Sequence, residues 1–194
     1  NRNVEDYVEL KYAYSMVQLF SRDMLGTLTS VLSKLCQAYE QPSVHSGVLA
    51  GPQGVLLLSV IHPSLRLMRR LLSHVIRCRD SDFHDLTAVP VLLQTYALVS
   101  AVPASCLFHP KVNECRSDIV ATLLAYSQPA VQANDDISNV NGTSVKPSAT
   151  PEDALSRSLW TQMIQEVLKF IHSCSGPAAA VTGLEVLNEL MPLP

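Results

Sequence analysis

The sequence carries few charges, and it lacks the short motifs that mark common enzyme sites. Charged residues make up 16% of its 194 residues, against about a quarter in typical soluble domains. It contains no phosphate-binding glycine loop, no nucleophile elbow and no paired-histidine metal motif. Cysteine, histidine and acidic side chains are present, but no spacing in the sequence brings them together. We therefore predict a protein that is not an enzyme and that uses no cofactor and no small-molecule substrate.

The charge balance is slightly acidic, with a formal net charge of −3 and an isoelectric point of about 6.1. This balance argues against a nucleic-acid-binding domain, for which a strongly basic surface is expected. Hydrophobic residues reach 47%, and the mean hydropathy is +0.18. Such an apolar composition indicates that part of the surface meets a partner or an adjoining part of a longer chain. The chain begins with Asn1 rather than methionine, and we expect an excised segment.

A membrane span is not expected. The longest apolar run, near residues 89–102, is interrupted by Pro90 and Gln94 and followed by Pro103. It is shorter than the roughly 20 apolar residues that a spanning helix requires.

The five cysteines are widely spaced and odd in number, and none belongs to a Cys-x-x-Cys motif. They are Cys36, Cys78, Cys106, Cys115 and Cys174. This pattern is typical of reduced, buried thiols in the cytosol or nucleus. His74 and Cys78 are four residues apart and could share a helix face with His84 nearby, but no second ligand pair has matching spacing. We favour a structural or incidental role for them and predict no metal site.

Helical periodicity runs through almost the whole sequence, and no hairpin signal occurs. It predicts an all-α protein of about eight helices. One short helix starts near Pro52, and Pro63 is expected to open the next, SLRLMRRLLSHVIRCRD. Residues 86–101 form a helix that is apolar nearly all round and should be buried between neighbours.

Residues 128–150 are rich in Asn, Ser, Asp and Pro and poor in large apolar groups. They cannot bury enough surface to offset their ordering entropy, so we predict a mobile polar loop. A further helix should begin after Thr150-Pro151. Residues 1–194 are thus one helical module. Its helix pairs recur at roughly 40 residues, the period of armadillo and HEAT repeats, which favours an α-solenoid segment over a closed bundle.

Four arginines lie on one side of the helix after Pro63, opposite its apolar side. We call Arg66, Arg69, Arg70 and Arg77 the arginine face. A solvated helix face is the simplest interpretation. The alternatives are a surface that docks an acidic protein partner and, less favoured, one that contacts RNA phosphates. Reversing the charge of Arg69 and Arg70 should leave folding intact if the face is solvated.

The last helix, VTGLEVLNELMPLP, has no reactive groups and repeats leucine and valine at helical spacing. Leu184 and Leu187 are candidates either for core packing or for contact with a neighbour. Aspartate at both positions should unfold the module or detach that neighbour.

Several phrases, in order, resemble the helical-repeat region of the Virilizer family. They are FSRDMLGTLTSVLSKLC, MRRLLSHVIRCRDSDFHDLTAVPVLLQTYALV, DIVATLLAYSQP, SLWTQMIQEVLKFIHSCS and VTGLEVLNELMPLP. The resemblance covers most of the chain apart from residues 128–150. It is carried by the run of phrases, not by a short diagnostic motif.

The resemblance implies armadillo- or HEAT-like helices and a nuclear, non-catalytic scaffold of the mRNA N6-methyladenosine writer complex. It also implies a role in alternative splicing, a coiled-coil adaptor subunit as protein partner, and contact with RNA that is indirect. It implies no catalytic residues. The competing interpretations are an RNA-binding helical module and an unrelated armadillo or HEAT interaction scaffold.

Overall fold

The computed structural model describes residues 2–40, 47–77, 83–127, 151–174 and 176–191. Throughout these residues the secondary structure is helical, with no strand, so the predicted all-α class is confirmed. The elements are α1 (Arg2–Ser21), α2 (Met24–Ala38), α3 (Pro52–Arg77), α4 (Ala88–Ser100), α5 (His109–Leu124), η2 (Ala125–Ser127), α6 (Pro151–Ser173) and α7 (Pro177–Leu190). The predicted polar loop, residues 128–150, lies outside the described residues.

The described residues contain seven α-helices and the single-turn 3₁₀ helix η2, where about eight helices were expected. The difference lies at Pro63, which is inside α3 and does not open a helix. Proline removes the N–H that would bond the carbonyl of Ser59. Pro63 is exposed, so this carbonyl lies on the solvent side of the helix. Ile61 and Leu65 on either side are fully buried, and their packing keeps α3 continuous.

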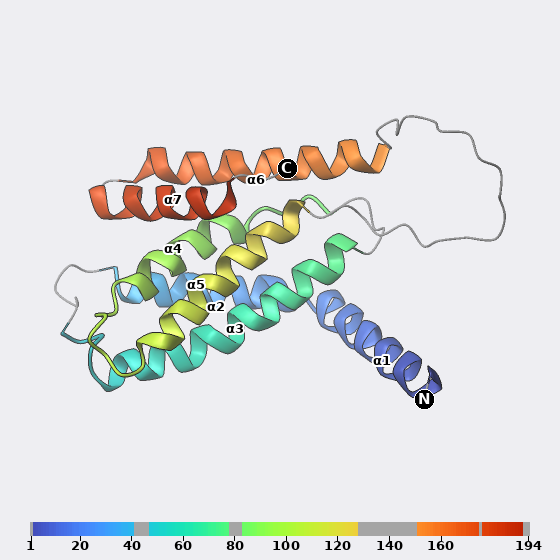
Figure 1. Ribbon diagram of the computed structural model, residues 1–194, viewed down its shortest axis with the longest axis horizontal. Helices are drawn as coiled ribbons and strands as arrows, with labels where there is room; N and C mark the ends of the chain where they lie inside the picture. Colours follow the sequence, from blue (N-terminus) through green and yellow to red (C-terminus); the bar gives the residue numbers. More distant parts are fainter. Residues whose placement is uncertain (1, 41–46, 78–82, 128–150, 175, 192–194) are drawn as a thin grey trace.

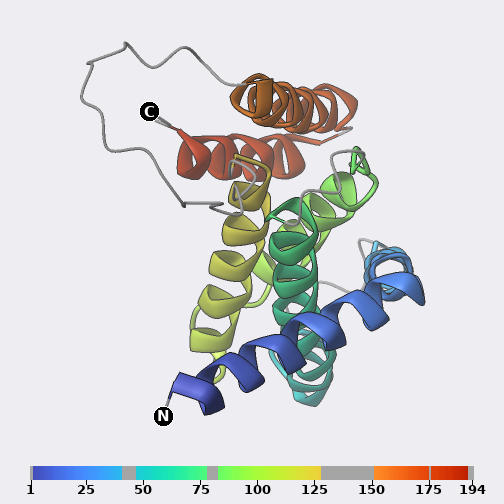
Figure 2. The same cartoon turned by 90° about the vertical axis from the view of Figure 1, so that its right-hand side faces the viewer.

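The helices form two sets whose members contact one another in chain order. In the first set α1 contacts α3, α3 contacts α5, and α5 contacts α7. In the second, α2 contacts α4, which contacts α6. Figures 1 and 2 show α1 at one end of the molecule and the pair α6–α7 at the other. The helices differ in length, from 26 residues in α3 to 13 in α4. The armadillo- or HEAT-like repeat stays a prediction.

One cluster of buried apolar side chains has members from each of the helices α2 through α7. Its fully buried members include Leu32, Ile61, Leu65, Met68, Leu92, Ile119, Leu123, Met163, Val167 and Val186. The apolar side predicted for the helix after Pro63, which is the second half of α3, is confirmed, because Met68, Leu71 and Leu72 have no exposed surface. The opposite side of α3 therefore faces outward with its arginines.

Helix α4 lies at the centre, as its apolar sequence predicts. It contacts α2, α5, α6 and α7, and Val89, Leu92 and Val99 are completely buried. A helix surrounded in this way has no room for a polar face. Within the described ranges no helix is long and apolar enough to cross a membrane.

Two buried protic side chains should make the fold sensitive to alkaline pH. Burial, and then the negative charges of Asp118 and Glu114, raise the pKa of Cys115 to about 12 from a usual 9.0. Burial, and then Asp85, raise the pKa of Tyr126 above its usual 10.0. Both groups favour the neutral form when folded, so the unfolded chain loses these protons first. The stability that these two groups contribute should be fully present below about pH 8 and should fall as the pH rises through 9.0, the usual pKa of the thiol, and beyond.

Thermal unfolding between pH 8 and 10.5 measures this loss. Tyr126→Phe should lower the melting temperature at pH 8, because the phenol donates a hydrogen bond to the Asp85 carbonyl at 3.2 Å. The same variant should show a shallower decline above pH 9. A decline as steep as that of the unsubstituted chain would contradict the assignment of the alkaline loss to Tyr126.

Candidate interaction surfaces

The arginine face lies on the outer side of α3. All four arginines are exposed, whereas Leu65, Met68 and Leu72 of the same helix are fully buried. The structure thus places the four predicted residues on one helix. Their surroundings differ. Arg69 has a structural role, whereas Arg66 and Arg70 can meet a partner.

Arg69 is tied to helix α5. Its Nη1 donates a hydrogen bond to Oδ1 of Asp118 at 2.9 Å, and the Asp118 side chain is only 12% exposed. The same carboxylate lies 3.8 Å from Nε2 of His62, which also lies 3.2 Å from Oε2 of Glu114. This cluster links α3 to α5, and Arg69 therefore compensates a nearly buried negative charge.

Arg66 and Arg70 stand one turn apart without an acidic partner among the described residues. Arg69, Arg116 and Lys169, by contrast, each form an ion pair with an acidic side chain. Two exposed guanidinium groups one turn apart can meet successive carboxylates of another molecule. Arg77 is exposed at the last residue of α3.

The side of helix α7 that faces the core is not the side that carries Leu184. Val186 and Leu190 are buried, with exposed fractions of 0% and 1%, whereas Leu184 is 55% exposed. Leu187 is half-buried and packs against the core. Of the two predicted candidates, Leu184 is thus available to a partner and Leu187 is largely used by the fold. Leu184 shares the exposed side of α7 with Val181, and Met191, directly after the helix, is exposed as well.

The approach of α6 to α7 explains this orientation. A methyl group on Gly183 would overlap Cγ1 of Ile171 on α6. The side of α7 that carries Gly183 is therefore the side on which the two helices approach most closely. Val186 and Leu190, at helical spacing on the same side, follow it into the core.

Helix α1 carries an exposed apolar stripe that no reactive motif in the sequence indicates. Tyr7, Leu10, Tyr14 and Val17 are exposed by 64%, 68%, 65% and 52%. We call these four residues the α1 seam. Their steps of three, four and three residues were the available signal, because that spacing puts all four on one side of a helix. The periodicity alone did not say whether this side is buried.

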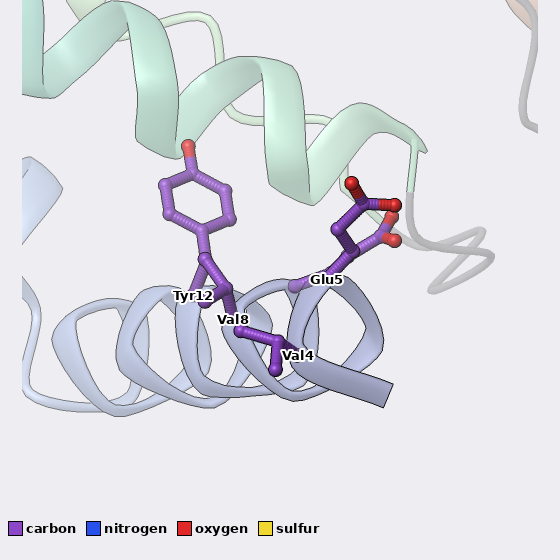
Figure 3. A pocket seen from close by; sticks show the side chains of 5 residues that line it. Val4, Glu5, Val8 and Tyr12 are labelled. Atoms are coloured by element: carbon purple, nitrogen blue, oxygen red, sulfur yellow. The ribbon is translucent and has the colours of Figure 1, made fainter. Parts of the chain in front are cut away.

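The opposite side of α1 faces α3. Figure 3 shows Tyr12 pointing toward that helix beside a shallow hollow, which is lined by Val4, Glu5, Val8, Glu9 and Tyr12. The Tyr12 ring meets the His74 ring edge-on, with centroids 6.4 Å apart. The hollow holds two carboxylates on an open helix surface, without a nucleophile or an arginine to complete a catalytic arrangement.

The part of the chain that the structure describes offers no candidate metal site. No group of three or more His, Cys, Asp or Glu residues there could hold a metal ion. Of the zinc candidates considered from the sequence, Cys78 lies outside the described residues, so the group His74, Cys78 and His84 is not tested. The described side chains on these surfaces can form ion pairs and apolar contacts with another molecule.

The sequence is similar to long curated proteins from insects and mammals. Protein virilizer of Drosophila melanogaster is 38% identical over 186 residues, which are 96% of this chain. Protein virilizer homolog of Homo sapiens and of Mus musculus is 27% identical over 187 residues. The chain spans 9% of the length of each of these relatives. No protein-family model matches the chain. Over the region that these relatives share with it, the chain belongs to the Virilizer family.

Proposed function

We propose that this chain is a non-catalytic nuclear scaffold segment that docks protein subunits of the mRNA N6-methyladenosine methyltransferase complex. Through that complex it contributes to mRNA methylation and alternative splicing. The expected partner is a coiled-coil adaptor subunit, and RNA is contacted indirectly. Membership of the Virilizer family supports the biological setting. Arg66 and Arg70, which are exposed and have no acidic partner among the described residues, carry the assignment of the docking surface.

The arrangement of helices suits a scaffold. Helices α1, α3, α5 and α7 are successive neighbours, as in stacked helical hairpins that present long binding surfaces. The two end helices carry exposed apolar groups, Leu10 on α1 and Leu184 on α7. We propose that these helices belong to an open armadillo- or HEAT-like stack.

A helix with acidic side chains fits the arginine face better than RNA does. Arg66 and Arg70 are one turn apart, so they match carboxylates one turn apart on a helix that runs beside α3. The RNA alternative is disfavoured by the charge beside this surface, because Glu114 is 59% exposed and Asp118 lies close by. The net charge of −3 acts in the same direction.

The docking prediction is tested by reversing the charges of Arg66 and Arg70 together. The variant Arg66→Glu/Arg70→Glu should fold normally and lose at least roughly tenfold in recovery of writer-complex subunits from nuclear extract. Recovery by the unsubstituted chain should survive ribonuclease. Lys34→Glu is the matched control, because Lys34 is an exposed cation on α2, in the other set of helices. Unchanged recovery with the double variant would remove the arginine face from the proposal.

A second variant separates the α7 surface from the arginine face. Leu184→Asp changes a side chain that is 55% exposed, so it should leave the fold intact and act only on a partner that covers α7. Recovery that disappears after ribonuclease treatment, or that falls steeply with salt, would instead favour the RNA-binding module.

A further inference from the structure

The α1 seam has the spacing of a coiled-coil interface. Tyr7 and Tyr14 are seven residues apart, and Leu10 and Val17 follow each of them by three. In heptad notation the tyrosines occupy a positions, and Leu10 and Val17 occupy d positions. All four side chains are more than half exposed. Such a row normally lies against a second helix in left-handed coiled-coil geometry.

The helix that carries the seam is already anchored on its other side. Met16 is only 7% exposed, and the Phe20 ring meets the Phe83 ring edge-on with centroids 6.2 Å apart. Helix α1 contacts α2 and α3, and Figure 2 shows it at the edge of the molecule. A partner helix therefore meets a preformed surface. The entropy cost of ordering an isolated helix does not oppose binding here.

Two opposite charges border the seam in a self-complementary pattern. Asp6 takes the g position and Lys11 the e position of the following heptad. Both are exposed, and neither forms an ion pair among the described residues. In a parallel two-stranded coil, each g residue faces the e residue five positions further along the other strand. Asp6 of one chain would therefore face Lys11 of an identical chain, and the reverse pair would form by symmetry.

We propose that the α1 seam pairs with the α1 seam of a second copy of this chain, forming a parallel two-fold dimer. Both chains use the same surface, as a closed two-fold interface requires. Leu10 at a d position is the residue type that parallel two-stranded coils favour. The tyrosines bury their rings and leave their hydroxyl groups at the wet edge. The inference does not depend on the docking role of the arginine face, which lies on another helix.

The dimer should be weak and concentration-dependent, since the seam contributes only two heptads. Sedimentation equilibrium of this chain, up to about 1 mM, should show reversible dimer formation without larger species. Asp6→Lys and Lys11→Asp each turn both reciprocal pairs into repulsions. Each should raise the dissociation constant by roughly tenfold. Circular dichroism at equal concentration checks that the variants are folded.

Restoration of the pairs gives the decisive comparison. The variant carrying both Asp6→Lys and Lys11→Asp rebuilds two attractive pairs and should dimerise like the unsubstituted chain. A mixture of the two single variants should form heterodimers in preference to either homodimer. Glu9→Lys is the matched control, because Glu9 is an exposed acid of α1 that lines the hollow and lies away from the seam. It should not change the dissociation constant.

Three results would overturn the proposal. The first is a monomer at every concentration, which would leave the seam to a different occupant. The second is a dimer that Leu10→Asp does not weaken. The third is a dimer that the double charge exchange fails to restore, which would exclude the parallel register.

Discussion

Gly54→Ala should lower the free energy of unfolding by about 3 kcal/mol. Gly54 is buried in the first turn of α3, where the chain from Leu49 folds back against it. A methyl group there would overlap the carbonyl oxygen of Leu49 and lie 2.9 Å from its carbonyl carbon. It would also lie 3.2 Å from Cζ of Phe108. The main chain of Leu49 cannot rotate away as a side chain can, so the turn itself must move. Equilibrium denaturation with urea measures the loss.

Gly51→Ala is the matched control, three residues earlier in the same segment. A methyl group at Gly51 would meet only the Val48 carbonyl oxygen, at an ordinary 3.6 Å. The backbone at Gly51 does not have positive φ, so alanine is tolerated. Its effect should be within about 1 kcal/mol and can be stabilising, since alanine restricts the unfolded chain. Equal stability of the two variants would contradict the close approach of Leu49 to α3.

The helices with the strongest periodicity were predictable from the sequence alone. The arginine-bearing segment after Pro63 showed one apolar side, and the structure buries Met68, Leu71 and Leu72 there. The helix at residues 86–101 lacked a polar side, and α4 is enclosed by four other helices. Burial follows from composition in both cases, because an apolar stripe has to be removed from water wherever the helix lies.

The continuity of α3 through Pro63 was not predictable from local rules. A proline at that position is compatible both with the first turn of a new helix and with the solvent side of a continuous one. The choice depends on whether core contacts exist on both sides of it. Those contacts come from elsewhere in the chain: α3 packs against α1, α2 and α5.

The orientation of α7 shows the same limit. The sequence of α7 offers two neighbouring apolar stripes. One runs through Leu184 and Leu187, and the other runs through Val186 and Leu190. Hydrophobicity alone does not determine which of the two stripes faces the core. Gly183 determines it, because a position without a side chain lets Ile171 of α6 approach α7 closely. The sequence shows the glycine but not the helix that approaches it.

The arginine face was predicted as four equivalent residues, and the structure distinguishes Arg69 from Arg66 and Arg70. The partner of Arg69 is Asp118, which is 49 residues further along the chain. A helical wheel places arginines on a side but does not show which neighbouring helix presents an acid to them. We therefore keep the expectation that charge reversal spares the fold for Arg70 and revise it for Arg69.

Arg69→Glu should destabilise the fold by roughly 2 kcal/mol. The substitution places a second carboxylate beside Asp118, whose side chain is 12% exposed, and removes the 2.9 Å hydrogen bond. The Arg69 side chain is 49% exposed, so solvent screens part of the repulsion. The loss should therefore be smaller than for a fully buried pair. Thermal and urea denaturation at pH 7 measure the change.

Arg70→Glu supplies the control, because it makes the same change one residue away without a described partner. Its effect should stay within about 0.5 kcal/mol. Adding Asp118→Lys to Arg69→Glu reverses the pair and should recover part of the lost stability, which a double-mutant cycle quantifies. Recovery is incomplete because a lysine at position 118 also faces His62. If Arg69→Glu were as stable as Arg70→Glu, the ion pair would not hold α3 against α5, and Arg69 would be as available to a partner as Arg66 and Arg70.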